Sequence, residues 1–469
     1  MRKTKIVGTI GPACIDYETM KKMVVAGLNV TRINLSHANV KDMNLIMKNI
    51  KRIRKELKVA LPVMIDTRGP ELRVKVFKDG SAEIVKGQQF IFTAKDIIGN
   101  EEMVSINMPD LVKEVKVGDK ILAVNGLMSF KVVEVDGENI ITKALTSGVI
   151  SNRKSLSIPG IKFNTPYLND ADKKDILWAI DNDVDFVAIS FVNSAADVET
   201  VRKFIKTNGG NLKIIAKVES LVGLDNLDEI LDSADAMMVA RGDLGVELPI
   251  EKLPNVQKQM ISKANEKGKP IITATEMLES MINSMRPTRA EVSDVANAVY
   301  DGSSAIMLSG ETAAGKHPVD VVKTMSKIAM ETEKHIDYIS EFKNKNYSLN
   351  NTTDVISHSA VSASYVQKMA AIVAFTYSGK TAELVSRFRP AVNIIGATPN
   401  EKIYRQMDLL WGVTPMLTPN FNTTDEMFDM VNDLIKKKNL ARVNDKIVIT
   451  CGTPNKGGGT NLIKVSSVK

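Results

Sequence analysis

Eight short apolar runs recur along the chain, and most of them are followed by a segment with helical patterning. Such regular alternation is typical of a parallel sheet built from βα units. Eight repeats are the number that closes a (β/α)8, or TIM, barrel. The sequence therefore predicts an α/β fold with such a barrel at its centre. The runs are Lys5–Ile10, Val30–Leu35, Val63–Asp66, Phe186–Phe191, Lys213–Val218, Ala236–Ala240, Pro270–Thr275 and Ala305–Leu308.

A long segment without the βα alternation separates the third apolar run from the fourth. Turn signals such as Lys78-Asp-Gly80 and Asp136-Gly137 divide it into short strand-like pieces. We expect residues 70–165 to form a small inserted β-barrel lid domain, which leaves 1–69 and 166–340 for the catalytic barrel. Those two parts together approach the ~250 residues that such a barrel needs. The strand-like pieces are Leu72–Phe77, Ser81–Val85, Gln89–Thr93, Lys120–Val124, Ser129–Val135 and Ile140–Ala144.

The last part of the chain, residues 341–469, is predicted to be a third domain. It begins with a polar stretch, Glu341–Asn351, that has the composition of a linker. Alternation of apolar runs and helical patterns then resumes, which indicates an open α/β domain with a regulatory or oligomerisation role. The apolar runs are Ile372–Thr376, Val392–Gly396, Val413–Leu417 and Lys446–Thr450.

Composition narrows the class of protein. The formal net charge is +7, which suits either nucleic acid or a small anionic substrate. Aromatic residues make up only 5% and the lysines are scattered, so the small anion is the better interpretation. The chain contains two cysteines and no apolar stretch of the ~20 residues that a membrane span requires. We therefore expect a cytoplasmic protein without nucleic acid or membrane partners.

Polar residues gather at the C-terminal ends of the predicted barrel strands, where barrel enzymes carry their active sites. Most occur as pairs at spacing i, i+2, and side chains at that spacing on a strand point the same way. A single pair could equally cap the following helix, but six strand ends with the same property favour an active site. The six are Asn34-Leu-Ser36, Asp66-Thr67, Lys217-Val-Glu219, Arg241-Gly-Asp243, Thr273-Ala-Thr275 and Ser309-Gly-Glu311.

The residue types at these ends indicate the chemistry. Glu219 and Asp243 supply the hard oxygen ligands that Mg²⁺ prefers. Lys217 would add positive charge beside the metal, and Arg32 and Arg73 could supply more. Enzymes that transfer phosphoryl groups typically use a metal ion together with lysine and arginine, because the reaction depends on positioning and charge neutralisation. The turn after Gly242 could also present backbone N–H groups to an anion.

Six segments in this order resemble the pyruvate kinase family and span the predicted barrel from end to end. The resemblance implies a phosphotransferase that moves the phosphoryl group of phosphoenolpyruvate to ADP in glycolysis, giving pyruvate and ATP. The inserted domain and the C-terminal α/β domain agree with that family. The segments are Thr4–Pro12, Arg32–His37, Asp66–Arg73, Met238–Gly245, Arg286–Asn297 and Met307–Thr312.

The resemblance also implies roles for individual residues. The catalytic residues would be Lys217, Arg73 and Thr275, with Lys217 neutralising the phosphoryl group and Thr275 helping to protonate the enolate. The Mg²⁺ (or Mn²⁺) ligands would be Glu219 and Asp243, and Glu71 is similar to the variant associated with K⁺ dependence. The K⁺ ligands would be Asn34, Ser36, Asp66 and Thr67. The substrate-binding residues would be Arg32, Lys217, Gly242, Asp243 and Thr275, and the residues for ADP or ATP would be Pro12, Arg32, Asn34, His37, Arg73, Arg153 and Lys154.

The C-terminal domain has a separate segment whose residues are typical of an anion-binding loop. This segment is Thr376-Tyr-Ser-Gly-Lys-Thr381, between an apolar run and a predicted helix. Hydroxyls and free amides at a helix start can cradle a phosphate, although a plain turn with a Ser or Thr N-cap would look the same. The segment also resembles the family's effector loop, which implies a sugar-phosphate effector at Thr376, Ser378, Gly379, Lys380 and Thr381. A homotetramer is a further expectation from the family.

Several positions depart from the family pattern. Ser155-Leu-Ser157 stands where Gly-Val-Asn is usual, Glu276 replaces a glutamine, Ala38 replaces a glycine, and Val222 occupies a position that is commonly polar. None of these changes removes a proposed metal ligand or Lys217, so the sequence still predicts a working enzyme. Two alternatives remain open at this stage: a carbon–carbon lyase that acts on pyruvate-like substrates, and a non-catalytic RNA-binding protein.

Overall fold

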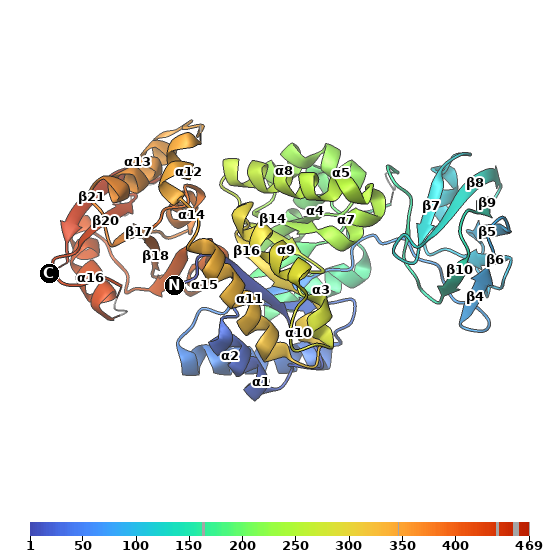
Figure 1. The fold of residues 1–469 in the computed structure, drawn as a ribbon, viewed down its shortest axis with the longest axis horizontal. Helices are drawn as coiled ribbons and strands as arrows, with labels where there is room; N and C mark the ends of the chain where they lie inside the picture. The colour runs from blue at the N-terminus through green and yellow to red at the C-terminus, as the bar shows by residue number, and fades with distance from the viewer. Residues whose placement is uncertain (162–164, 346, 438–439, 454–458, 469) are drawn as a thin grey trace.

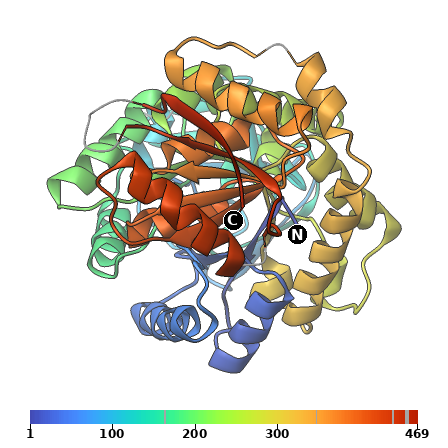
Figure 2. The ribbon, with the colours of Figure 1, turned by 90° about the vertical axis from the view of Figure 1, so that its left-hand side faces the viewer.

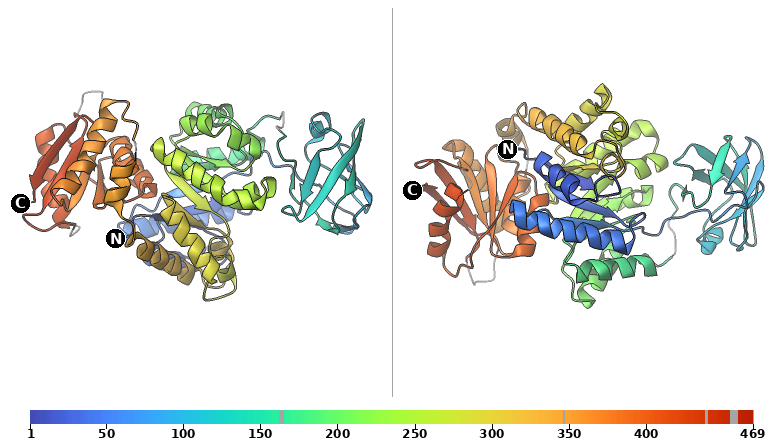
Figure 3. Two further views of the ribbon diagram at one scale, coloured as in Figure 1. Left: turned by 45° about the horizontal axis from the view of Figure 1, so that its top comes forward. Right: turned by 90° about the horizontal axis from the view of Figure 1, so that it is seen from below.

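The molecule consists of three bodies in a row (Figure 1). The computed structural model describes residues 1–161, 165–345, 347–437, 440–453 and 459–468. A barrel lies at the centre, an all-β domain lies at one end, and a C-terminal α/β domain that contains the chain end lies at the other (Figure 3). Separate hydrophobic cores fill the inserted domain and the C-terminal domain. The predicted fold class is confirmed, while the boundaries at residues 70, 166 and 341 stay predictions.

All eight predicted runs form the strands of one closed parallel barrel, with strand order β1-β16-β15-β14-β13-β12-β3-β2. Its interior is filled by apolar side chains such as Val7, Met64, Ile215 and Met238, so the barrel is a packed core with no channel through it. Only the strand ends are therefore free to carry polar groups. The strands are β1 (Lys5–Thr9), β2 (Val30–Asn34), β3 (Val63–Asp66), β12 (Phe186–Ile189), β13 (Lys213–Val218), β14 (Ala236–Ala240), β15 (Ile271–Ala274) and β16 (Ala305–Leu308).

Helices surround the barrel and bury their apolar faces against its strands. Capping side chains define where several of these helices begin: Asn39 accepts from the Asp42 amide, and Thr288 forms a reciprocal capping box with Glu291. The main ones are α1 (Tyr17–Ala26), α2 (Val40–Leu57), α3 (Asp170–Asp181), α4 (Ala195–Thr207), α6 (Leu227–Ser233), α8 (Leu253–Glu266), α9 (Arg289–Tyr300) and α11 (Pro318–Glu333).

The inserted domain is built from a six-stranded sheet, β11-β7-β8-β9-β5-β6, and a two-stranded sheet, β10-β4. Its core contains Phe90, Phe92 and Phe130, whose rings pack within 6 Å of one another. The predicted strand Leu72–Phe77 is wrong, because its residues form only isolated bridges to three separate segments. The strands are β4 (Ser81–Ile84), β5 (Gln89–Thr93), β6 (Met103–Ser105), β7 (Lys120–Ala123), β8 (Met128–Asp136), β9 (Asn139–Ala144), β10 (Gly148–Ser151) and β11 (Leu156–Ser157).

The C-terminal domain is a five-stranded sheet, β19-β18-β17-β20-β21, with helices packed against it (Figure 2). The first four strands are parallel as predicted, and β21 adds an antiparallel edge that the sequence did not reveal. The strands are β17 (Ala371–Phe375), β18 (Asn393–Thr398), β19 (Val413–Leu417), β20 (Lys446–Cys451) and β21 (Leu462–Ser467). The helices are α13 (Thr352–Val366), α14 (Lys380–Arg387), α15 (Glu401–Gln406) and α16 (Thr424–Lys437).

The predicted linker is partly helical. Its first residues belong to α12 (Tyr338–Asn344), and α13 begins directly after it. The reason lies in Phe342, which is buried and stacks on His358 of α13, with ring centroids 4.7 Å apart. One aromatic residue in a polar stretch is therefore enough to anchor the segment on the domain core.

Buried ion pairs attach the C-terminal domain to the N-terminal end of the barrel. Lys5 Nζ on β1 lies 2.9 Å from Asp408 Oδ1. Arg405 Nε lies 2.7 Å from Asp185 Oδ1, just before β12. The inserted domain is joined to the opposite, C-terminal end of the strands, so the strand ends that carry polar residues face the lid.

Candidate active site

Lys217 occupies the centre of the polar cluster at the C-terminal end of the barrel. It lies near the end of β13, and its Nζ donates to Ser190 Oγ at 2.7 Å and to Asp66 Oδ1 at 3.0 Å. Glu219 Oε1 also lies 3.0 Å from the same Nζ. Burial alone would lower the pKa of Lys217, but Asp66 and Glu219 outweigh it and raise the pKa above its ordinary value. The ammonium is therefore held charged at one fixed place.

Asp66 connects this lysine to an arginine on a neighbouring strand. Arg32 Nε lies 2.7 Å from Asp66 Oδ2, and Arg32 Nη1 donates to Thr9 Oγ1 at 2.8 Å. Asp66 is buried, which favours its neutral form, yet the Arg32 and Lys217 charges outweigh burial and lower its pKa. One carboxylate thus orients two cations, and the three groups together carry a net positive charge.

Glu219 is the unusual member of the cluster. Its Oε2 accepts from the Phe191 amide at 2.7 Å, whereas among the described residues its buried Oε1 meets only the Lys217 ammonium, at 3.0 Å. Burial raises the pKa of Glu219 to about 8, because Lys217 lowers it less and Asp243 and Asp66 raise it further. A buried carboxylate is costly unless positive charge offsets it, and Lys217 already divides its single charge between Glu219 and Asp66.

Because Lys217 does not fully offset the buried charge of Glu219, the pair Glu219 and Asp243 fits a divalent metal ion. Asp243 is exposed at the start of α7 (Arg241–Glu247), directly after β14, and it is close enough to influence the charge state of Glu219. Among the described residues no group of three or more His, Cys, Asp or Glu side chains could hold a metal. Two carboxylates still suit Mg²⁺, which completes its shell with water and substrate oxygens.

Thr275 and Gly242 meet across the ends of β15 and β14. Thr275 Oγ1 accepts from the Gly242 amide at 2.9 Å and donates to the Ala274 carbonyl at 2.6 Å. Thr275 has φ +71°, a left-handed conformation that is strained for a β-branched residue. Arg241 stabilises this backbone, because its Nε donates to the Thr275 carbonyl at 3.2 Å while its Nη1 pairs with Asp294 at 2.7 Å.

The four residues predicted to bind K⁺ lie on the two neighbouring strands β2 and β3. Asn34 and Asp66 are direct register partners, and Asn34 Oδ1 accepts from the Ser36 amide at 3.1 Å. Thr67 follows Asp66, and its carbonyl accepts from Ser190 Oγ at 2.8 Å. The structure therefore brings these residues to one edge of the barrel mouth, with the Asp66 side chain already shared by Arg32 and Lys217.

The predicted nucleotide residues are divided between the barrel and the lid. Of the predicted nucleotide residues, His37 and Arg73 line a cavity of about 500 Å³ at the junction of the two bodies, together with Ser36 and Glu71, whereas Arg32 and Asn34 do not line it. Arg73 Nε donates to Glu71 Oε2 at 2.9 Å, and its Nη1 donates to the Arg153 carbonyl at 2.8 Å. Pro12 and the exposed Arg153 and Lys154 do not line this cavity, and no hydrogen bond or ion pair joins the side chains of Arg153 or Lys154 to the barrel in the described ranges.

Ser155 and Ser157, which depart from the family pattern, make contacts at this junction. Ser155 Oγ donates to Glu71, and Ser157 Oγ donates to Glu247 Oε1 at 2.8 Å. Glu247 belongs to α7, so the second contact ties the returning lid segment to the barrel. Burial raises the pKa of Glu247 above its ordinary value.

Sequence analysis missed Ser190, the residue after β12. Ser190 Oγ accepts from Lys217 Nζ and donates to the Thr67 carbonyl, so it connects two predicted site residues. The six polar strand ends did not include β12, because its end carries one serine beside Phe191 and lacks a polar pair. A search for single hydroxyl residues at the strand ends, in addition to polar pairs, would have found Ser190.

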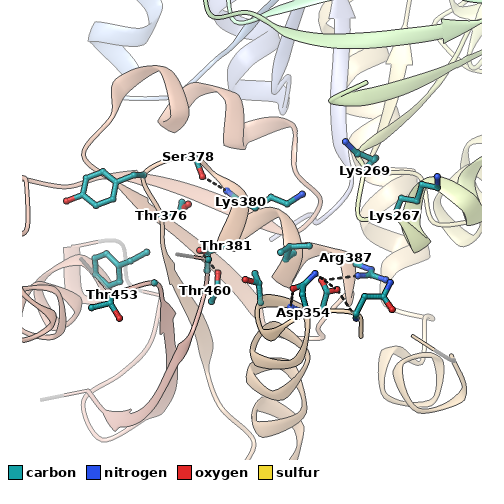
Figure 4. Close-up of a pocket in the computed structure, with 18 of the residues that line it drawn as sticks. Lys267, Lys269, Asp354, Thr376, Ser378, Lys380, Thr381, Arg387, Thr453 and Thr460 are labelled. Carbon is teal, nitrogen blue, oxygen red and sulfur yellow. Dashed lines mark hydrogen bonds and ion pairs between the residues drawn. The ribbon is translucent and has the colours of Figure 1, made fainter. Parts of the chain in front are cut away.

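Four of the five predicted effector residues, Thr376, Ser378, Lys380 and Thr381, line a cavity of about 1060 Å³ between the C-terminal domain and the barrel (Figure 4). Gly379, with φ +86°, precedes α14, and its amide donates to Thr376 Oγ1 at 2.9 Å. Thr381 Oγ1 lies 2.8 Å from Thr460 Oγ1. Lys267 and Lys269 approach the cavity from the barrel side in the same view, so both bodies contribute to its walls.

The fold and this site define a class before any comparison is made. A (β/α)8 barrel holds a buried lysine, two carboxylates suited to a divalent ion and an oriented arginine at the C-terminal ends of its strands. These groups stabilise negative charge and fit an oxygen-bound metal, which is the equipment of a phosphotransferase.

Comparisons with known proteins agree with that class. Residues 1–322 match the family model "Pyruvate kinase, barrel domain", and residues 354–466 match "Pyruvate kinase, alpha/beta domain". A pyruvate kinase of Geobacillus stearothermophilus is 43% identical over 99% of this chain and 80% of its own length. One of Clostridium perfringens is 40% identical over the full length of both chains. A pyruvate kinase crystal structure from Cryptosporidium parvum superposes with a TM-score of 0.94 at 36% identity, covering 100% of this chain and 96% of its own.

The chain therefore belongs to the pyruvate kinase family, and it is a phosphotransferase. The family assignment favours this activity over the lyase and the RNA-binding protein that the sequence left open. The comparisons do not assign roles to individual residues, which depend on the geometry described above.

Proposed function

We propose that this chain transfers the phosphoryl group of phosphoenolpyruvate to ADP at the C-terminal end of the barrel, giving pyruvate and ATP. One observation carries the assignment of the site. Lys217 is fixed by Asp66, Ser190 and the buried carboxylate of Glu219 at the C-terminal ends of the strands. Such a preorganised positive group stabilises charge that develops in a transition state without reorganising.

Lys217 and Arg32 are proposed to bind the phosphoryl group of phosphoenolpyruvate. Asp66 holds both cations, so their side chains need no ordering when the substrate arrives. Lys217 would neutralise the transferring group, and Arg32 would orient it. Gly242 and Asp243 complete the proposed substrate site, because they lie in the first turn of α7 at the mouth of the barrel.

Glu219 and Asp243 are proposed to hold Mg²⁺ or Mn²⁺. The bound ion would supply positive charge to the phosphoryl oxygens and would bridge enzyme and substrate. K⁺ is proposed to lie beside Asn34, Ser36, Asp66 and Thr67. In this proposal Glu71, whose carboxylate pairs with Arg73, gives the site the acidic residue associated with K⁺ dependence.

Thr275 is proposed to assist protonation of the enolate that remains after phosphoryl transfer. Its hydroxyl donates to the Ala274 carbonyl and accepts from the Gly242 amide, which fixes the position of Oγ1 at the mouth. The strained backbone of Thr275, held by Arg241, is consistent with a functional constraint on this position.

The nucleotide is proposed to bind between the barrel and the lid. Pro12, Asn34 and His37 would contact ADP or ATP from the barrel, and Arg73 with Arg153 and Lys154 would contact its phosphates from the lid. Figures 1 and 3 show the lid at the end of the barrel away from the C-terminal domain. Closure of the lid over the barrel mouth would exclude water from the reacting groups.

The proposal also covers the regulation, the oligomeric state and the cellular location of the protein. The cavity at Thr376, Ser378, Gly379, Lys380 and Thr381 is proposed to bind a sugar phosphate, and the chain is proposed to form a homotetramer in the cytoplasm. Among the described helices, none has the length and apolar character needed to cross a membrane. A monomer seen by light scattering at working concentration would contradict the tetramer.

Pyruvate formation by the full chain tests the proposed activity. The assay contains phosphoenolpyruvate, ADP and Mg²⁺, with parallel samples that lack K⁺ or lack ADP. We expect pyruvate only when ADP and K⁺ are both present. Activity without K⁺ would keep the enzyme but overturn the role of Glu71, and pyruvate release without ADP would overturn the phosphotransfer itself.

A further inference from the structure

A cavity lies on the far side of the barrel from the lid, next to the C-terminal domain. This cavity, of about 600 Å³, separates the C-terminal half of α2 from β19 and its neighbours in the C-terminal domain. In Figure 3 the long blue helix α2 runs along the barrel, with one end beside the C-terminal domain. The cavity shares no lining residue with the barrel mouth or with the pocket at Thr381. Its volume is in the range of small-molecule sites.

The α2 wall of this cavity is strongly basic. Lys51, Lys55 and Lys58 line it, and all three are exposed. Lys51 and Lys55 lie at i and i+4 of α2 and share one face of the helix, and Lys58 follows directly at its C-terminal cap. None of the three forms an ion pair with a carboxylate within the described parts of the chain, and Lys51 and Lys55 repel each other at this spacing. This face is therefore short of negative charge.

Two arginines in the same cavity are already neutralised. Arg54 Nη2 lies 3.0 Å from Asp185 Oδ2, and Arg405 Nε lies 2.7 Å from Asp185 Oδ1. Arg405 Nη2 also lies 2.7 Å from Asp183 Oδ2. In these ion pairs the charges of both arginines are compensated, and the pairs of Arg405 connect the C-terminal domain to the barrel. Glu401 is the single carboxylate among the lining residues of the cavity. The unpaired positive charge is thus confined to the three lysines.

The conformation of Lys58 supports a function for this wall. It ends α2 in the left-handed region with φ +53°, a position where glycine is the usual residue. A lysine there is strained, and its side chain nevertheless lines the cavity.

The opposite wall is apolar. Pro415, Met416 and Leu417 of β19, together with Tyr404 and Pro419, line it, and Leu417 is 45% exposed although its side chain is apolar. A ligand that bound the lysines alone would leave this surface in water. A ligand with a ring would cover it and gain the free energy of burying apolar area.

From these two walls we infer that the cleft between α2 and β19 binds a small phosphate monoester that carries an apolar ring. The phosphate lies against Lys51, Lys55 and Lys58, and the ring packs on Tyr404 and Leu417. Lysine binds phosphate as a point charge and needs no fixed fork geometry, so the three lysines of this wall suffice. Because each wall belongs to a different body, the bound ligand also favours the observed orientation of the C-terminal domain on the barrel.

The alternative is a helix face whose lysines are merely solvated, and titration calorimetry with 1-naphthyl phosphate distinguishes the two. The full chain is saturated with Mg²⁺ and phosphoenolpyruvate to occupy the barrel mouth. The variant Lys51→Glu/Lys55→Glu/Lys58→Glu is compared with Lys48→Glu, which reverses an exposed charge on α2 outside the cavity. We expect the triple variant to weaken binding by at least ~10-fold and Lys48→Glu to leave it within ~2-fold.

Further variants and ligands test which chemical class of ligand binds and in which cavity it binds. Leu417→Ser, which removes apolar area without adding charge, should weaken binding of 1-naphthyl phosphate and leave inorganic phosphate unchanged, and 1-naphthol should not bind. Thr381→Val, in the other cavity, should retain full affinity. Three results would each overturn the proposal. The first is equal affinity of the wild type and the triple variant for 1-naphthyl phosphate, and the second is loss of binding in Thr381→Val. The third is equal affinity of the wild type for 1-naphthyl phosphate and inorganic phosphate. The pyruvate-forming rate and the melting temperature of each variant report whether it has folded.

Discussion

The barrel mouth and the pocket of the C-terminal domain both collect groups that bind anions, but they do so by different means. At the mouth the charged groups are buried and hold one another, as Asp66 holds Lys217 and Arg32. In the C-terminal pocket, partly exposed lysines such as Lys267 and Lys380 lie beside the hydroxyls of the loop before α14, and Lys380 pairs with the neighbouring Glu383. A fixed buried charge suits the stabilisation of a transition state, whereas partly exposed cations and hydroxyls suit reversible binding.

The largest expected effect is at Lys217. Lys217→Met should lower kcat by at least ~10²–10³, because it removes a positive group that acts on the transferring phosphoryl. The matched control is Lys269→Met, which removes a barrel lysine that lines the C-terminal pocket. Steady-state kinetics without added effector should show near-normal kcat for that control. A folded Lys217→Met enzyme with near-normal kcat would place the chemistry elsewhere.

Glu219→Gln should produce the next largest effect. The change keeps the volume and removes the charge that faces the metal, so the Mg²⁺ concentration for half-maximal activity should rise ~10-fold or more. Glu276→Gln, at an exposed strand end, is the control and should leave the Mg²⁺ dependence unchanged. An unaltered Mg²⁺ requirement in Glu219→Gln would remove this residue from the metal site.

The raised pKa of Glu219 predicts a dependence of stability on pH when no metal is bound. The folded state holds this proton up to a pKa of about 8, whereas the unfolded chain releases it near the ordinary value of 4.5. Between these values the folded state binds more protons, so the free energy of unfolding should fall as pH rises, by up to ~1.4 kcal/mol per pH unit.

Urea unfolding of the metal-free protein at several pH values measures this slope. Glu219→Gln cannot titrate, so its slope should be smaller than that of the wild type across the same window. Identical slopes in the two proteins would contradict the burial argument for Glu219.

The smallest effect is expected in the C-terminal pocket. Thr381→Val removes one hydroxyl, and loss of a single neutral hydrogen bond should weaken sugar-phosphate activation by only ~5–10-fold. Basal kcat should stay unchanged, as measured in the pyruvate assay over a titration of sugar phosphate. A fall in basal kcat equal to the fall in activation would erase the distinction between the two regions.

Much of the barrel could be predicted from the sequence because its strands are buried on both faces. Continuous apolar runs located all eight strands, and polar residues after them located Lys217, Glu219 and Asp66. Ser190 escaped notice because a single serine after a strand gives a weak signal, and its importance arises only from contacts with Lys217 and Thr67.

Prediction was poorer where pairing depends on distant segments. The edge strand β21 is half polar, since one of its faces meets solvent, and no apolar run marks it. Leu72–Phe77 has a strand-like pattern but lacks a single partner strand, so it forms only bridges. Likewise, the cleft between α2 and β19 joins residues more than three hundred positions apart, and no local pattern could have revealed it.

The most direct test of the account is a crystal structure of the full chain with Mn²⁺ and phosphoenolpyruvate, collected at a wavelength where manganese scatters anomalously. The account predicts an anomalous peak between the carboxylates of Glu219 and Asp243, with the phosphoryl group of the substrate beside Lys217. A peak at other residues, or phosphoenolpyruvate bound away from Lys217, would contradict the assignment of the barrel mouth as the reaction site.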